Sequence, residues 1–159
     1  INAAFKPFGA VAAPFFSGAA RWLSRSRWLP SALASPTPRW RATASMLSDT
    51  GSTVTPESSR CYDTLLSDPG HIAGTLRMMA GWDLPPLLER LPQLDSAVWL
   101  IACEGDRTIP PSRSMTVASR LKRCRTLLVP ALGHLGHEES PDTFVDIFQN
   151  LVTENSVNP

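Results

Sequence analysis

The chain has few features of a disulfide-bonded or membrane-spanning protein. Its three cysteines, Cys61, Cys103 and Cys124, are widely spaced, and no C-x-x-C pair occurs. This odd, dispersed set argues against a disulfide framework and a zinc knuckle, and favours buried thiols in a reducing compartment. No stretch of 18 or more apolar residues is free of charges and helix breakers, so we expect no transmembrane segment. The 159 residues are enough for one soluble cytoplasmic domain.

Acidic residues are absent from the first 48 positions, which carry six basic side chains. The remaining residues carry nine basic and fourteen acidic side chains, so the formal net charge of the chain is only +1. This balance does not indicate a globally basic protein, and we expect no nucleic-acid partner.

Residues 3–30 are rich in Ala, Phe, Trp, Ser and Arg and are interrupted by Pro7, Pro14 and Pro30. Three interpretations compete: an organelle transit peptide, an aromatic and basic helix at a membrane interface, or an apolar lid of short helices over a pocket. Because the prolines interrupt any long amphipathic helix, we favour the lid. Peripheral contact with a membrane remains an alternative for this segment.

The next segment contains turn and cap signals. Residues 31–45 hold Pro36 and Pro38 among serines and threonines, which predicts a connector. Thr55 before Pro56 predicts the start of a helix, with Thr55 as its N-cap. We expect Pro69-Gly70 to end that helix and residues 71–80 to form another.

From residue 84 onwards, the pattern becomes that of an α/β protein. The apolar run SAVWLIAC has the length and composition of a buried parallel strand. The expected order is a short helix at 84–94, this strand at 96–103, a helix at 111–121, a second strand at 126–129 and a final helix capped by Ser140. Strand, helix, strand and helix at these lengths predict a parallel β-α-β unit.

Two polar side chains follow the two predicted strands. Asp106 comes directly after the first strand, and His134 follows the second, 28 positions later. Functional groups collect beyond the carboxyl ends of parallel strands, so the two loops can meet. An acid that orients an imidazole base is the arrangement of a hydrolytic triad. The alternatives are a turn-capping aspartate beside Gly105 and an ordinary loop histidine, and we favour the acid–base pair.

A second histidine and two glutamates follow in the stretch GHLGHEESP. Histidines three positions apart, His134 and His137, could in principle bind zinc, but no third ligand is apparent. We therefore expect neither a metal site nor a cofactor.

The stretch LERLPQLDSAVWLIACEGDRTIPPSRS, together with LLVPALGHLGHEESPDTF, resembles the C-terminal part of an α/β-hydrolase. The stretches INAAFKPFG and GSTVTPESSRCYDTLLSDPGHIAGTLRMMAGWDL extend the resemblance to the magnesium chelatase accessory proteins of bacteriochlorophyll biosynthesis. The resemblance covers nearly the whole chain. It implies an α/β class chain with the α/β-hydrolase fold, holding the helical cap and the last parallel strands with their flanking helices.

The resemblance also implies roles for individual residues. Asp106 is the expected triad acid and His134 the expected base. Residues 1–2 would end a core strand, residues 3–90 would form the cap, and residues 91–159 would form the C-terminal part of the core. The opening segment would be a pocket wall, in which the expected substrate-binding residues are Phe5, Phe8, Arg21, Trp22 and Arg25. His137 could also face the pocket, although an orienting or surface role is the preferred interpretation.

The sequence departs from the family pattern at two points. Cys103 stands three residues before the acid, where glycine is common, so we expect a distorted turn there. No G-x-S-x-G occurs, and we expect the nucleophile elbow and the oxyanion-hole loop to precede Ile1. The chain alone should then be inactive and should need an N-terminal half or a second chain.

Two functions follow as hypotheses. The first is a serine hydrolase that acts on an ester or a tetrapyrrole-linked small molecule in bacteriochlorophyll biosynthesis. The alternative is a non-catalytic accessory protein that binds a porphyrin and assists the magnesium chelatase complex. For a tetrapyrrole, aromatic side chains would supply stacking surface, and Arg21, Arg25 and Arg27 would pair with carboxylates. The competing interpretation is that these aromatics pack the cap core and the arginines are solvated.

Overall fold

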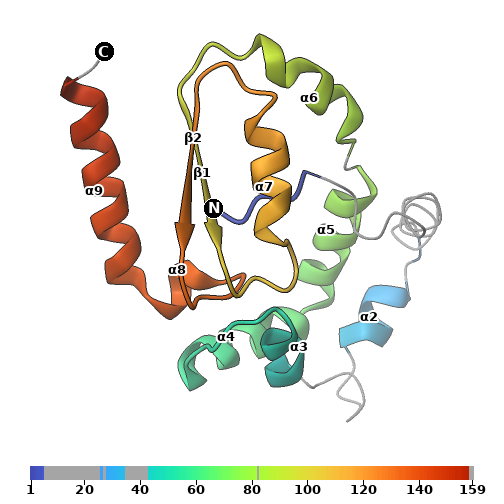
Figure 1. The fold of residues 1–159 in the computed structure, drawn as a ribbon. Helices are drawn as coiled ribbons and strands as arrows, with labels where there is room; N and C mark the ends of the chain where they lie inside the picture. Colours follow the sequence, from blue (N-terminus) through green and yellow to red (C-terminus); the bar gives the residue numbers. More distant parts are fainter. Residues whose placement is uncertain (6–25, 27, 35–42, 82, 158–159) are drawn as a thin grey trace.

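The computed structural model describes residues 1–5, 26, 28–34, 43–81 and 83–157, and its helices surround a small parallel sheet (Figure 1). The elements before the sheet are α2 (Leu29–Ala34), α3 (Thr43–Asp49), α4 (Pro56–Leu66), α5 (Pro69–Ala80), α6 (Pro85–Arg90) and the 3-10 turn η1 (Leu91–Gln93). The elements of the C-terminal part are β1 (Val98–Cys103), α7 (Pro111–Ala118), β2 (Cys124–Val129), α8 (Gly136–Glu139) and α9 (Pro141–Val157).

The two strands confirm the predicted β-α-β unit. Strands β1 and β2 pair in parallel, with a register that runs from Val98 opposite Cys124 to Cys103 opposite Val129. Helix α7 connects them. Strand β1 begins two residues later than predicted and β2 two residues earlier. The carboxyl ends of both strands therefore lie side by side, which brings the loops that follow them together.

Both faces of β1 are buried, as its continuous apolar run predicts. Ile101 and Cys103 pack with Val129 and with Phe144 of α9 on one face. Leu100 packs on the other face with Leu91 and with Val117 of α7. Figure 1 shows α7 and α9 on opposite sides of the strands. Alternate residues of one strand thus anchor the helices that flank it.

Two helix starts depend on proline and a polar cap, and one of them differs from its prediction. Thr55 caps α4, where its Oγ1 accepts a hydrogen bond from Ser58 N at 3.2 Å, as predicted. Pro69-Gly70 does not end this helix but begins α5, because Asp68 Oδ1 accepts from Gly70 N at 2.8 Å. Proline fits the first helical position, since its absent N–H has no partner there.

The predicted connector at residues 31–45 is also wrong at both ends. Helix α2 continues to Ala34, and α3 begins at Thr43. The prolines Pro36 and Pro38 that suggested the connector lie outside the described residues. Across the described part of the chain, no helix is both long enough and apolar enough to cross a membrane.

Candidate active site

Asp106 is a fully enclosed carboxylate with three hydrogen bonds. Its side chain is 0% exposed, and Oδ1 accepts from the backbone N–H of Thr108 at 2.8 Å and of Ile109 at 2.7 Å. These two bonds form because the chain turns tightly after β1, where Asp106 N donates to Cys103 O at 3.2 Å. The bonds fix the plane of the carboxylate, so that Oδ2 faces His134.

His134 meets this carboxylate from the loop after β2. Its Nδ1 lies 2.8 Å from Asp106 Oδ2, and its side chain is 28% exposed. When Nδ1 donates to the carboxylate, the neutral ring presents Nε2 as an acceptor. Within the described part of the chain, no side chain or backbone group hydrogen-bonds Nε2. An oriented imidazole with an accessible acceptor nitrogen has the geometry that a general base requires.

A turn between α3 and α4 contacts both of these loops. We call residues 50–53 the strap. We call residues 104–110, after β1, the acid loop and residues 130–135, after β2, the histidine loop. Thr50 O accepts from Arg107 N of the acid loop at 3.1 Å and from His134 N of the histidine loop at 3.3 Å. Ser52 Oγ accepts from Leu135 N at 2.8 Å. The strap therefore joins the acid loop to the histidine loop through backbone hydrogen bonds.

Glycine is required where the strap crosses these loops. Gly51 has φ +83°, and a Cβ on it would lie 2.0 Å from Gly105 O. A Cβ on Gly133 would lie 2.3 Å from the carbonyl carbon of Gly51. Side chains at these positions would push the strap, the acid loop and the histidine loop apart. The approach of Asp106 to His134 therefore depends on glycine, which has no side chain, at these positions.

Asn2 connects the end of β1 to the histidine loop through hydrogen bonds of its side chain. It is 6% exposed and adopts φ 45°, a conformation that asparagine tolerates better than most residues. Its Oδ1 accepts from Cys103 N at 2.9 Å, and its Nδ2 donates to His134 O at 2.7 Å. Its backbone N donates to Ile101 O at 2.8 Å, so residue 2 lies along β1.

The side chains of α8 contact different elements, and Glu138 Oε1 also lies 4.0 Å from His137 Nε2. Glu138 Oε1 accepts from Tyr62 Oη of α4 at 2.6 Å. Glu139 accepts from Gly133 N at 2.8 Å and, with its other oxygen, from Thr53 N at 2.9 Å. His137 is 48% exposed, and its ring lies edge-on to Phe144 of α9, with centroids 6.3 Å apart.

Cys103 is a packing residue beneath this loop. Its side chain is 0% exposed, and a Cβ on Gly136 would lie 2.6 Å from its Sγ. Burial raises the pKa of the Cys103 thiol, and the Asn2 hydrogen bond lowers it by a smaller amount. The cysteine does not displace the acid, because Asp106 still reaches His134.

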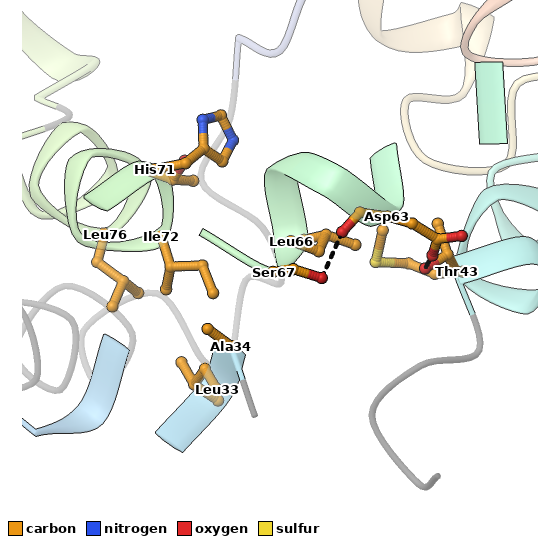
Figure 2. A pocket seen from close by; sticks show the side chains of 11 residues that line it. Leu33, Ala34, Thr43, Asp63, Leu66, Ser67, His71, Ile72 and Leu76 are labelled. Atoms are coloured by element: carbon orange, nitrogen blue, oxygen red, sulfur yellow. Dashed lines mark hydrogen bonds between the residues drawn. The ribbon is translucent and has the colours of Figure 1, made fainter. Parts of the chain in front are cut away.

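The described residues enclose a cavity of about 300 Å³ between the helices that precede the sheet (Figure 2). Figure 2 shows one wall formed by Leu33, Ala34, Ile72 and Leu76 of α2 and α5, and the opposite wall by Thr43, Asp63, Leu66 and Ser67. The Thr43 hydroxyl donates to Asp63 Oδ1 across α3 and α4. A second cavity of about 360 Å³ is lined partly by Ser52 and Thr53 of the strap. Neither Asp106 nor His134 lines these cavities.

The other predicted substrate-binding residues are distributed differently. Phe5 packs against the core cluster of Leu91, Leu100 and Val117, so its contact with a substrate stays a prediction. Phe8, Arg21, Trp22 and Arg25 lie outside the described residues. No group of three or more His, Cys, Asp or Glu side chains within the described ranges could hold a metal ion.

A family model described as the alpha/beta hydrolase family matches residues 2–147. The chain belongs to the α/β-hydrolase family. This membership confirms the predicted resemblance and the α/β-hydrolase fold. The junction of Asp106, His134 and the strap is thus a site in an α/β-hydrolase chain.

One relative is a Rhodobacter capsulatus protein named magnesium-chelatase 30 kDa subunit. It is 35% identical over 142 residues, which are 89% of this chain and 50% of that protein. The fold is similar to a thermophilic esterase from Thermogutta terrifontis, with TM-score 0.61, 16% identity and coverage of 96% of this chain and 54% of that one. A candidate lipase (lip1) from Acinetobacter baumannii gives TM-score 0.60, 11% identity and coverages of 85% and 49%. The chain therefore spans about half the length of the relatives that it matches.

Sequence reasoning missed the strap, Asn2 and the role of Glu139. Thr50-Gly51 is a recognisable turn signal, but the sequence does not say which loops the turn touches. Asn2 and Glu139 act through partners more than 80 positions away, at Cys103 and Thr53 respectively. No local pattern could have identified these contacts.

We expect Gly51→Ala to lower the stability of this chain by at least about 2 kcal/mol, since it adds left-handed backbone strain and a clash with Gly105 O. Gly74→Ala is the matched control, because a Cβ there meets nothing within 4 Å and glycine within helix α5 is unfavourable. The control should raise stability by about 0.5–1 kcal/mol. Urea-unfolding midpoints of the protein encoded by the longest natural reading frame that contains this chain measure both changes, and equal midpoints for the two variants would contradict the close approach.

Tyr62 offers a direct measurement of the contact between α4 and α8, because it is the single tyrosine of the chain. Burial, followed by the hydrogen bond and charge of Glu138, raises the pKa of Tyr62 from 10.0 to about 12. The stability that the neutral phenol contributes is therefore fully present below pH 10 and is lost as the pH rises through about 12.

Ultraviolet titration of tyrosinate in the protein encoded by the longest natural reading frame that contains this chain, taken as the difference from its Tyr62→Phe variant, tests this contact. Glu138→Gln should move the pKa of Tyr62 back toward 10.0, because only burial then remains. Glu57→Gln is the control, since Glu57 lies on the same helix as Tyr62, α4, but pairs with Arg60 and not with Tyr62. A titration midpoint near 10 in the unchanged chain would show that the Tyr62–Glu138 bond does not form.

Proposed function

We propose that this chain supplies the acid and the base of a hydrolytic triad, with Asp106 orienting His134. The observation that supports this function is the 2.8 Å contact between Asp106 Oδ2 and His134 Nδ1 at the carboxyl ends of adjacent parallel strands. The order of acid before histidine is that of the α/β-hydrolases. The proposed reaction is hydrolysis of an ester-like or tetrapyrrole-linked small molecule.

In the proposed mechanism, His134 Nε2 removes the proton of a nucleophilic hydroxyl and later returns it to the leaving group. Asp106 holds the ring in the tautomer that leaves Nε2 unprotonated, and it stabilises the imidazolium that forms. The two backbone N–H groups on Asp106 Oδ1 keep the carboxylate from rotating away.

The nucleophile and the oxyanion hole would lie outside these 159 residues, since no G-x-S-x-G occurs within them. The hydrogen bond from Asn2 N to Ile101 O supports residues 1–2 as the end of a neighbouring core strand. Residues 3–90 would then form the cap and residues 91–159 the C-terminal part of the core. Of the three free thiols, which we expected to be buried, Cys103 is buried but Cys61 is exposed. Their unpaired state supports a reducing, cytoplasmic location as part of the proposal.

The protein encoded by the longest natural reading frame that contains this chain should hydrolyse short p-nitrophenyl esters. It should also react with a fluorophosphonate probe. His134→Gln should lower kcat by about 10²–10⁴-fold, because it removes the general base. Asp106→Asn should also lower kcat, since it disturbs the tautomer of the ring. Asp95→Asn is the matched control, because Asp95 is 85% exposed and pairs with Lys122 on the surface. Ester turnover that is unchanged in His134→Gln would exclude this pair from catalysis.

A second function is favoured by the relative at 35% identity that is named a magnesium-chelatase subunit. In this alternative, the protein does not catalyse hydrolysis but binds a porphyrin and assists a magnesium chelatase complex. If the protein encoded by the longest natural reading frame shows neither ester turnover nor probe labelling, that result would favour the accessory function.

Porphyrin titration followed by tryptophan quenching tests this alternative. Saturable binding should weaken with salt and in the variant with Arg21, Arg25 and Arg27 changed to Ala, because these side chains would pair with the propionates. Arg60→Ala is the control, since Arg60 pairs with Glu57 on the surface of α4. Binding that is indifferent to all three arginines would reject the proposed carboxylate contacts.

A further inference from the structure

Three consecutive backbone amides of the histidine loop are held by groups outside the sheet. Gly133 N donates to Glu139 at 2.8 Å, His134 N to Thr50 O at 3.3 Å and Leu135 N to Ser52 Oγ at 2.8 Å. None of these three bonds comes from a strand partner. The position of His134 at the end of β2 therefore depends on the strap and on Glu139, together with Asn2, whose Nδ2 donates to His134 O at 2.7 Å.

Glu139 is the only one of these three acceptors that is ionisable, and it accepts twice. Oε1 accepts from Gly133 N, and Oε2 accepts from Thr53 N at 2.9 Å. A carboxylate is a stronger acceptor than a carbonyl or a hydroxyl. Gly133 is buried, so leaving its N–H without this acceptor is costly. One side chain thus ties the residue before His134 to the strap.

We propose that Glu139 is a positioning residue for His134, which holds the histidine loop against the strap so that Nδ1 stays aimed at Asp106. The kinetic consequence rests on the proposed hydrolytic function, whereas the geometric claim does not. Because the strap joins α3 to α4, displacement of these helices would act on Thr53 N–H and, through Glu139, on the loop of the base. The docking of these helices and the orientation of the imidazole are then coupled.

The neighbouring Glu138 provides a matched control. Glu138 lies on the same short helix and carries the same charge, but its carboxylate accepts from Tyr62 Oη and lies 4.0 Å from His137 Nε2. Its one bond to the histidine loop, from Glu138 N to Leu135 O at 2.8 Å, is a backbone bond that the substitution leaves in place. Glu138→Gln removes one negative charge from α8 and leaves both Glu139 bonds in place. Glu139→Gln removes the same charge and one of the two acceptor oxygens. Glu139→Asp keeps the charge but is too short to span both amides.

Ring nitrogen NMR measures the effect without an activity assay. The protein encoded by the longest natural reading frame that contains this chain is labelled with ¹⁵N-histidine. The His134 signals are identified by their loss in His134→Gln. We expect one Nδ1-protonated tautomer in the unchanged protein and in Glu138→Gln. Glu139→Gln and Glu139→Asp should show mixed tautomers, because the ring no longer stays on Asp106.

Kinetics give a second readout if the protein hydrolyses esters. Glu139→Gln should lower kcat by up to about 10²-fold, as for a misplaced catalytic group, with little change in KM. Glu138→Gln should leave both constants unchanged. Mixed tautomers in Glu139→Gln together with an absence of ester turnover would reject the hydrolytic function but support the positioning role.

Three outcomes overturn the inference. The first is an unchanged His134 tautomer in both Glu139 variants. The second is an equal change in Glu138→Gln and Glu139→Gln, which would assign the effect to charge alone. The third is loss of the fold in both Glu139 variants, seen by circular dichroism, while Glu138→Gln remains folded. That result would make Glu139 a residue of general stability.

Discussion

The arrangement of the site depends on the close approach of three backbone segments at Gly51, Gly105 and Gly133. A Cβ on Gly105 would lie 2.8 Å from Leu132 O, and one on Gly133 would lie 2.4 Å from Gly51 O. The acid loop, the histidine loop and the strap therefore lie so close together that a residue with a Cβ atom at these glycines would clash with a neighbouring backbone. Hydrogen bonds from Arg107 N and His134 N to the single carbonyl of Thr50 then hold both loops to one point.

The sheet supplies the frame for this junction, and packing on its two faces keeps the frame in register. Ile101 and Cys103 anchor one face of β1 to α9, and Leu100 anchors the other to α7. A slip of one residue along β1 would exchange these two faces. Such a slip would also move Asp106 by about 3.3 Å relative to β2, which is enough to break its contact with His134.

The sequence alone could predict the elements that depend on local patterns. The apolar run ending at Cys103, the cap at Thr55 and the acid and histidine after the two strands all carry signals within a few residues. Pro69-Gly70 was misinterpreted because proline both ends and begins helices, and the deciding feature was the Asp68 carboxylate that caps α5. The junction around Gly51 could not be predicted, because its contacts join residues that are more than 50 positions apart.

The histidine-rich stretch after β2 shows why composition alone suggests several functions. Two histidines followed by two glutamates contain groups that bind metals, yet the structure gives these side chains different protein partners. His134 contacts Asp106, Glu138 accepts from Tyr62, and Glu139 accepts from two backbone amides. The stretch is better understood as one imidazole with a buried acid on one side and a set of backbone restraints on the other. Its chemistry then depends on what approaches the second ring nitrogen.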